Sequence, residues 1–461
     1  MSSTHVRLIG DDLLVPCADG TERPYLSLDG AASTAALPAV ADRVTEFLPW
    51  YSSVHRGAGY KSQMATAAYE DARLAALRFA GRDPDGDDVA IIVRNTTEAI
   101  NHLAYRLPLT AEDVVVTTVA EHHANLLPWG RLPAGRRFVE CGTDGTFGVD
   151  DVTAVLDATP QTALLAITAA TNVTGWLPPI DAIIDAAHDR GIRVAVDAAQ
   201  LAAHRPMPAG ADFIAWSGHK MYAPFGSGVL IGPRSAFEQG DPFLAGGGAV
   251  DLVDLDEVIW TDPPEREEAG SPNVIGAVAL HAAIDELDRI GWEAIAEHEA
   301  ALATRLKHGL AGIAGVRLLG PALDIQTLAV ASFVIADQPH ALVAARLSAE
   351  FGIGVRHGCF CAHPYLVRLL GLTDAEVEHY RADVLRGDRR TIPGAVRASA
   401  GLSTTEAEID RFLDAVAVIA AGDPPPVDYV QDETTGDFWP EGEAAPWSTG
   451  DRALGASCSR G

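Results

Sequence analysis

Short runs of β-branched and other apolar residues alternate along the chain with Ala-rich stretches of helical periodicity. The runs cover residues 89–93, 114–118, 163–168, 193–197, 213–215 and 228–231. The clearest helical stretches cover residues 63–80, 97–105 and 180–190, and Pro178 and Pro179 mark the start of the last. This alternation predicts an α/β fold with a mostly parallel sheet between helices. Ligands of such sheets bind beyond the carboxyl ends of the strands.

The pattern changes after Gly276, and this change divides the chain. Long amphipathic helices are expected at 281–290 and 292–314, then a strand at 328–335 and a helix at 340–350. From Gly422 onward the sequence is Pro-rich and then acidic, without periodicity. We therefore expect four parts: an N-terminal segment (1–24) that packs with the small domain, a large domain (25–285), a small domain (286–421) and a flexible acidic tail (422–461).

Composition narrows the choice of partners. The 461 residues are 48% hydrophobic, which is enough for a large core, and the formal net charge is −29. Such a charge repels phosphate backbones and anionic membranes, so neither nucleic acid nor a membrane is expected as a partner. The first residues do not resemble a signal peptide, and no run reaches the ~18 apolar residues of a membrane helix. A cytoplasmic location is expected.

Two scarce residue types carry the candidate chemistry. The five cysteines are too few for a disulfide scaffold of this size, so they are expected to act as thiols. The only lysines are Lys61, Lys220 and Lys307. Lys220 follows a short apolar strand, and Asp197 ends the strand before it. A carboxylate and an amine so placed suit a pyridine cofactor, because the acid keeps the ring nitrogen protonated and the amine forms an imine.

Several motifs together resemble one family. Residues 216–229 (WSGHKMYAPFGSGV) resemble the lysine motif of class V aminotransferase-fold enzymes, specifically the SufS-type cysteine desulfurases. Further matches follow in the family's order from Tyr25 to Val418: 54–57 (VHRG), 95–101 (NTTEAIN), 121–125 (EHHAN), 172–173 (NV), 197–200 (DAAQ), 270–273 (GSPN) and 397–399 (RAS). The resemblance implies fold type I of pyridoxal-phosphate (PLP) enzymes. Its large domain has a mostly parallel seven-stranded sheet, and its small domain is α+β.

The resemblance also assigns roles to single residues. It implies that Lys220 binds the cofactor covalently, that His122 stacks on its ring and moves protons, and that Asp197 pairs with the ring nitrogen. The other cofactor-binding residues it implies are Thr96, Thr97, Asn172, Gln200, Ser217, His219 and Ser271. Thr96 and Thr97 also open a helix, where backbone amides favour a phosphate, although a plain N-cap has the same pattern. Ser271 stands where family members have a threonine that reaches the phosphate of the other subunit of a homodimer.

Arginines are the expected substrate-binding groups. Arg397 resembles the family's ligand for the substrate carboxylate, a role that suits the two parallel donors of a guanidinium. Arg356 and Asn172 are expected beside it. A solvated arginine at a helix edge remains the alternative for Arg397.

The segment 355–364 (VRHGCFCAHP) distinguishes the reactions that this fold supports. Cys361 falls on the persulfide-forming cysteine of SufS-type enzymes, and Arg356, His357 and His363 are expected to favour its thiolate. The pair Cys359-Phe360 departs from that pattern and resembles molybdenum cofactor sulfurases, which leaves the sulfur acceptor open.

Two other interpretations of this segment remain. His357, Cys359, Cys361 and His363 alternate, so on an extended strand they face one way and would suit zinc. Alternatively, both cysteines are structural. We favour neither and expect no metal.

The sequence therefore predicts a PLP-dependent cysteine desulfurase that converts L-cysteine to L-alanine, leaves a persulfide on Cys361 and passes the sulfur to an acceptor protein. A class V aminotransferase, lyase or epimerase acting on another amino acid is the first alternative. A degenerate sulfur-transfer or assembly partner is the second.

Overall fold

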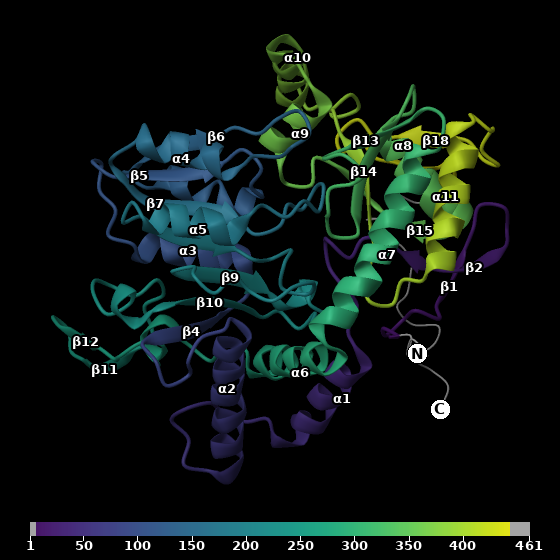
Figure 1. Ribbon diagram of the computed structural model, residues 1–461. Helices are drawn as coiled ribbons and strands as arrows, with labels where there is room; N and C mark the ends of the chain where they lie inside the picture. The colour runs from purple at the N-terminus through teal and green to yellow at the C-terminus, as the bar shows by residue number, and fades with distance from the viewer. Residues whose placement is uncertain (1–5, 443–461) are drawn as a thin grey trace.

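The computed structural model describes residues 6–442 and has two bodies, each with its own sheet (Figure 1). The larger body contains the seven-stranded sheet, and the smaller one contains a four-stranded sheet. Helix α7 (Trp292–Ala311) runs from the edge of the larger body into the smaller one. Within residues 6–442 no helix has the length and apolar character needed to cross a bilayer.

The large sheet has the predicted, mostly parallel arrangement. Its order is β4 (Asp88–Val93), β10 (Gly228–Pro233), β9 (Phe213–Ser217), β8 (Arg193–Asp197), β7 (Thr162–Thr168), β5 (Val114–Thr118) and β6 (Gly135–Val139). Only β10 runs antiparallel to its neighbours. The central strands are buried along almost their whole length, as expected of a sheet covered on both faces.

Helices cover both faces of this sheet (Figure 1). They are α2 (Tyr60–Phe79), α3 (Thr96–Arg106), α4 (Val149–Asp157), α5 (Ile180–His188) and α6 (Val274–Ile290). Helix α1 (Pro38–Phe47) packs against α6. The true N-cap of α3 is Asn95, whose side chain accepts a hydrogen bond from the Glu98 amide at 3.0 Å. The helix therefore begins directly after β4, and its first turn faces the carboxyl ends of the parallel strands.

The small domain is an antiparallel sheet packed on helices. The strand order is β13 (Val316–Leu319), β14 (Val330–Ile335), β17 (Ala395–Ser399) and β16 (Arg356–Gly358). Helices α7, α8 (His340–Phe351) and α11 (Glu406–Ala420) contact it or one another, and their apolar residues form a separate core. Helices α9 (His363–Leu370) and α10 (Asp374–Leu385) project at the top of Figure 1.

The N-terminal segment contacts the small domain. Strands β1 (Leu14–Pro16) and β2 (Glu22–Pro24) form a hairpin, and the amide of Ala18 donates to the Ala349 carbonyl at 2.7 Å. Strand β3 (Leu26–Ser27) pairs with β15 (Ile353–Gly354). Contacts with the small domain therefore extend past residue 25, because Leu26 and Leu28 also lie in the small-domain core.

The expectation of a flexible tail from Gly422 is wrong for residues 422–442. Strands β18 (Tyr429–Gln431) and β19 (Phe438–Pro440) form a hairpin beside α8. The Tyr429 hydroxyl bonds Glu350 at 3.1 Å, and Asp437 pairs with His357 on β16 at 3.2 Å. Periodicity could not reveal strands of three residues that are held by such distant contacts. The rest of the expected tail, 443–461, lies outside the described residues.

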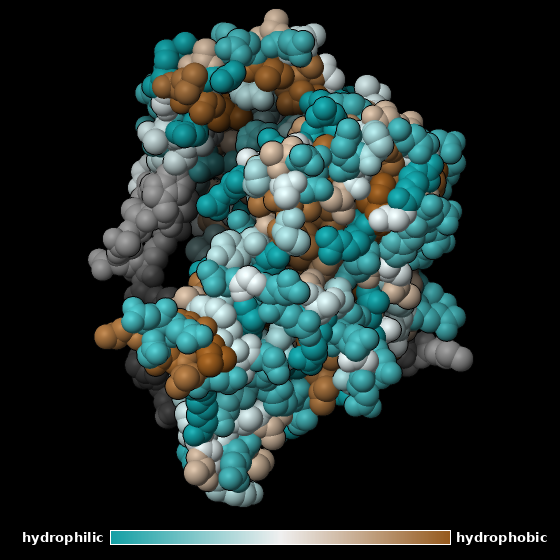
Figure 2. Space-filling model, turned by 90° about the vertical axis from the view of Figure 1, so that its left-hand side faces the viewer, coloured by the Kyte–Doolittle hydropathy of each residue, from teal (hydrophilic) through white to brown (hydrophobic). Residues whose placement is uncertain are grey.

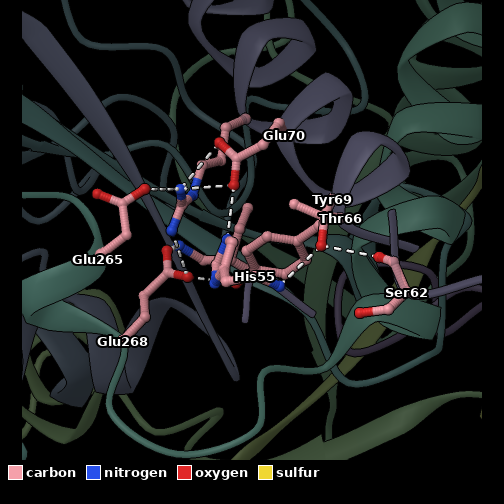
Figure 3. Close-up of polar contacts among 9 residues, drawn as sticks. His55, Ser62, Thr66, Tyr69, Glu70, Glu265 and Glu268 are labelled. Carbon is pink, nitrogen blue, oxygen red and sulfur yellow. Dashed lines mark hydrogen bonds and ion pairs between the residues drawn. The ribbon is translucent and has the colours of Figure 1, made fainter. Parts of the chain in front are cut away.

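A buried polar network ties α2 to the segment before α6 (Figure 3). Arg73 on α2 donates to Glu268 at 2.8 Å and to Glu265 and Glu70 at 2.9 Å. Only 4% of the side chains of Arg73 and Glu268 is exposed, so this ion pair is buried, and the carboxylates raise the pKa of Arg73 against the effect of burial. A buried pair of this kind holds its elements together because neither charge tolerates the loss of the other.

One hairpin leaves apolar side chains in solvent. It consists of β11 (Val250–Val253) and β12 (Val258–Trp260), and Leu252, Val253, Leu255 and Ile259 are all exposed. Figure 2 shows apolar surface gathered on a projection at the height of this hairpin in Figure 1. Contiguous apolar surface of this sort marks an interaction site.

Candidate active site

A cavity of about 310 Å³ lies where the parallel strands end and the small domain begins. Every site residue expected from the sequence lines it, except Ser271. Ser271 is exposed, which is compatible with a role toward another subunit. The cavity thus lies at the carboxyl edge that the strand pattern indicated.

Lys220 and Asp197 enter the cavity from neighbouring strands. Asp197 is the last residue of β8. Lys220 is the last residue of the short 3-10 turn Gly218–Lys220, which follows β9. Burial lowers the pKa of Lys220 to about 8, against the effect of Asp197, and raises the pKa of Asp197, against the effect of Lys220. The amine is therefore partly unprotonated near neutral pH, and the acid lacks a full counter-charge. Both properties fit a cofactor that presents an aldehyde and a protonated ring.

Hydroxyl groups and amides gather at the start of α3. The Thr96 amide donates to Ser217 Oγ at 2.8 Å, and the two hydroxyl oxygens lie 2.6 Å apart. Gly228 allows this approach, because a Cβ there would come within 2.7 Å of Asn95 Cα. The positive end of the helix dipole and these hydroxyls fit a phosphate, with Thr97 and His219 also on the cavity wall.

His122 is a neutral ring in the cavity wall. Its Nδ1 accepts a hydrogen bond from the Ala124 amide at 3.0 Å, so the proton resides on Nε2. Burial, helped by the charges of Lys220 and nearby cations, lowers its pKa to about 3. The residue before His122 is Glu121, a buried acid to which the sequence motifs assigned no role. Glu121 accepts from Asn125 at 2.7 Å and from the Thr168 amide at 3.0 Å, and so fixes this loop.

Two amides complete the wall. Asn172 donates through Nδ2 to the Phe360 carbonyl at 2.7 Å, while its buried Oδ1 has no hydrogen-bond partner among the described residues. Gln200 donates to the Ala31 carbonyl at 2.7 Å. A buried acceptor without a donor carries a free-energy cost, which a ligand with a donor group would remove.

Arg356 and Arg397 are directly paired residues of β16 and β17. Arg397 is buried, donates to the Asn172 carbonyl at 2.9 Å and lies over the Phe360 ring, 5.0 Å from its centroid. Arg356 is exposed and pairs with Asp29 at 3.0 Å. Asp29 is a second residue that sequence reasoning did not assign. The helix-edge alternative for Arg397 is wrong, because the residue lies in a strand.

Cys361 lies on the cavity wall with Lys220, at a tight turn after β16. Its side chain is exposed, and its carbonyl accepts from the His123 amide at 2.7 Å. His123 in turn stacks on His363, with centroids 5.1 Å apart. His357 was also expected to act on the Cys361 thiol. It instead contacts His340 and Asp437, and so points toward the tail hairpin.

The zinc alternative does not fit this geometry. Phe360 and Cys361 have φ of 54° and 53°, so the segment turns and its alternate side chains do not share a face. Among residues 6–442 only His55, Glu70 and Glu265 bring three possible metal ligands within 4.8 Å of one another. Arg73 donates to both of these glutamates, so a guanidinium already lies against the group.

Comparison with known proteins decides the family. Residues 26–412 match the model of the aminotransferase class V family. The chain belongs to that family. A cysteine desulfurase of Dickeya dadantii is 35% identical over 403 residues, which cover 85% of this chain and 91% of the relative. A probable cysteine desulfurase of Mycolicibacterium paratuberculosis is 36% identical over 411 residues. The chain spans only about half of that relative, because 56% of it is matched.

Solved structures of cysteine desulfurases agree with the fold. The apo cysteine desulfurase of Thermococcus onnurineus superposes with a TM-score of 0.77 at 32% identity, covering 86% of this chain and 95% of that one. The cysteine desulfurase CsdA of Escherichia coli superposes with a TM-score of 0.72 at 31% identity, covering 85% and 94%. The expected fold and family are therefore confirmed. The tail hairpin lies beyond the matched residues of the family model.

Proposed function

We propose that the chain is a PLP-dependent cysteine desulfurase that converts L-cysteine to L-alanine and retains the sulfur as a persulfide on Cys361. The observation that carries the proposal is the position of Cys361: an exposed thiol at a turn in the same cavity as the half-buried amine of Lys220. Relatives over most of the chain are named cysteine desulfurases, which supports the choice among class V reactions.

Different residues of the cavity would bind different parts of the cofactor. Ser217, Thr96 and the start of α3 would hold the phosphate, and Asp197 the ring nitrogen. Lys220 would bind the aldehyde, and the Asn172 Oδ1 atom offers a free acceptor. When bound, pyridoxal phosphate supplies a carbonyl for the amine and a ring that withdraws electrons from the substrate carbon.

The remaining steps belong to the chain's own groups. Arg397 binds the substrate carboxylate with two donors, and this orients the substrate. The Lys220 amine takes the Cα proton, since a base with a pKa near the working pH transfers protons well. Cys361 Sγ, as the thiolate, attacks the substrate sulfur, and the carbon part leaves as alanine. The exposed position of Cys361 then lets an acceptor protein reach the persulfide.

The proposal includes a homodimer. Ser271 faces solvent in one chain, and the β11–β12 hairpin exposes Leu252, Leu255 and Ile259, a surface that a second copy would cover. An exposed catalytic thiol works in a reducing compartment, so we place the protein in the cytoplasm.

A direct assay tests the proposal. Purified protein loaded with pyridoxal phosphate is incubated with L-cysteine and a reductant, and alanine and sulfide are measured. Both products are expected in equal amounts, and Cys361→Ser is expected to lose both while retaining the cofactor's absorption. Cys141→Ser is the matched control, because Cys141 is a half-buried free thiol outside the cavity. Alanine formation by Cys361→Ser at the wild-type rate would refute the proposal.

A further inference from the structure

The turn that carries Cys361 places a second thiol beside it. Residues 359–362 form a β-turn closed by a hydrogen bond from the Ala362 amide to the Cys359 carbonyl at 2.9 Å. The two central residues, Phe360 and Cys361, both have positive φ, a conformation that Gly, Asn and Asp prefer in such turns. A residue with a Cβ is strained in this left-handed conformation.

Contacts from outside the turn offset this strain. Phe360 is buried under Arg397, its carbonyl accepts from Asn172, and the Cys361 carbonyl accepts from the His123 amide. Strained backbone persists where the surroundings fix it, and it concentrates at functional sites. These contacts hold both cysteines on one restrained turn.

The spacing of the two cysteines on this turn is within the reach of a disulfide. Two consecutive peptide units span at most about 7.6 Å between Cα atoms, and a tight turn shortens this span. Disulfides form at Cα separations of roughly 4.4–6.8 Å. A negative charge on Cys361 also raises the pKa of the Cys359 thiol, so the two groups interact.

The two thiols differ in their surroundings. Cys361 is exposed in the cavity, whereas Cys359 is half-buried and packs against the large core. Burial raises the pKa of Cys359, while backbone amides of the turn, including those of Cys361 and Ala362, favour its thiolate. The raised pKa favours the thiol form of Cys359 over its thiolate.

We propose that Cys359 resolves the persulfide formed on Cys361, releasing the sulfur as hydrosulfide and leaving a Cys359–Cys361 disulfide. The inference rests on the proposed function, since it needs the persulfide. It gives this chain a route for sulfur release that needs no acceptor in the first turnover.

The step balances without an external oxidant. Cys359 loses its proton to solvent, and its sulfur attacks Cys361 Sγ. The bond between Cys361 Sγ and the terminal sulfur breaks, a bond between the two cysteine sulfurs forms, and the terminal sulfur leaves as HS⁻. The terminal sulfur is reduced, the Cys359 sulfur is oxidised, and Cys361 Sγ keeps the oxidation state that it had in the persulfide.

Proximity and leaving group both favour the step. A thiol on the same turn attacks as an intramolecular nucleophile, which raises its effective concentration greatly. A sulfur species of low pKa is also a good leaving group in thiol–disulfide exchange. The ring that closes across one intervening residue is strained, so the disulfide is easily reduced, and small thiols or a dithiol protein would regenerate the enzyme.

A single-turnover experiment tests the inference. PLP-loaded enzyme is reduced, freed of reductant under anaerobic conditions and mixed with less than one equivalent of L-cysteine per active site, so that each reacting site turns over once and little free thiol remains. Alanine and free sulfide are then quantified after an alkylating quench. The tryptic peptide 357–368 contains both cysteines, so its mass distinguishes the states.

The wild-type enzyme is expected to release about one sulfide for each alanine, and its peptide to lose about 2 Da as a disulfide. In Cys359→Ser the ratio of sulfide to alanine is expected to fall at least about tenfold, while the peptide gains about 32 Da as a persulfide. Cys141→Ser is expected to behave like the wild type, because this thiol lies outside the cavity.

Each other outcome is decisive. A wild-type peptide that retains the added sulfur, with Cys359 alkylated, overturns the inference while the alanine supports the proposed function. Absence of alanine from wild-type protein overturns the proposed function and, with it, the inference. Because the wild-type masses alone separate these outcomes, the test does not depend on whether Cys359→Ser folds.

Discussion

Arg397 donates through Nη2 to Asp29 Oδ1 at 3.3 Å, across 368 residues of sequence. Asp29 also pairs with Arg356, so one carboxylate connects both arginines that face the substrate side of the cavity. The carboxylate of an amino acid substrate would be the second anion, after Asp29, that contacts these two arginines. Burial lowers the pKa of Arg397 to about 10, so the cation gains from any further carboxylate.

Replacement of Arg397 tests its role in substrate binding. Arg397→Lys is expected to raise KM for L-cysteine by about 10-fold or more, because the ammonium group offers no bidentate pair. Arg356→Lys is the matched control, with a smaller expected effect since Arg356 is exposed. Steady-state kinetics measures both. Equal effects of the two variants would contradict the assignment.

Lys220 is expected to be the only lysine required for the cofactor. Lys220→Ala should lose the visible absorption of the bound cofactor and fall in activity by several orders of magnitude. Lys61→Ala should retain both, because Lys61 is exposed on α2 and does not line the cavity. Absorption spectra and the alanine assay check this prediction. An unchanged spectrum in Lys220→Ala would remove the cofactor assignment.

The pH dependence of cofactor loading follows from the same amine. Burial lowers the pKa of Lys220 to about 8, and only the unprotonated amine attacks an aldehyde. The unprotonated fraction grows as pH rises, so the rate of loading apo-enzyme should increase through pH 8 and level off above it. Stopped-flow absorbance measures this rate. A midpoint near the usual lysine value would mean that the amine is in water.

The buried pair of Arg73 and Glu268 is expected to stabilise the large domain. Arg73→Ala leaves the Glu268 carboxylate buried without its cation, which should lower the free energy of unfolding by about 3–5 kcal/mol. Arg305→Ala breaks an exposed pair with Asp410 and should change stability little. Urea unfolding compares the two. Similar midpoints would show that the network in Figure 3 contributes little.

Sequence periodicity predicted the parts of the sheet that are uniformly apolar. Strands β5 and β8 have the expected bounds, because their residues are buried on both faces. Edge strand β6 was missed since Arg136 and Arg137 interrupt its apolar run. Short strands such as β16 and β19 depend on pairing with distant segments, which no local pattern records.

The site residues show the same difference between local sequence patterns and contacts with distant segments. Motifs gave Lys220, Asp197 and Cys361, because each stands at a strand end or turn with a recognisable neighbourhood. Asp29 was missed, since its meaning comes from two arginines that lie more than 300 residues away. The turn at Phe360 was missed as well, because its positive φ results from tertiary contacts rather than from turn-forming residues.

The carboxyl-terminal hairpin gives the end of the polypeptide a mechanical connection to the site. Asp437 forms an ion pair with His357, and the residues on either side of His357 in β16 are Arg356 and Gly358. A load on this end, for instance from a surface tether or a bulky fusion partner, would pass through that contact into the strand leading to the cysteines. If the enzyme is immobilised, attachment at this end would therefore put tension on the turn that carries the sulfur.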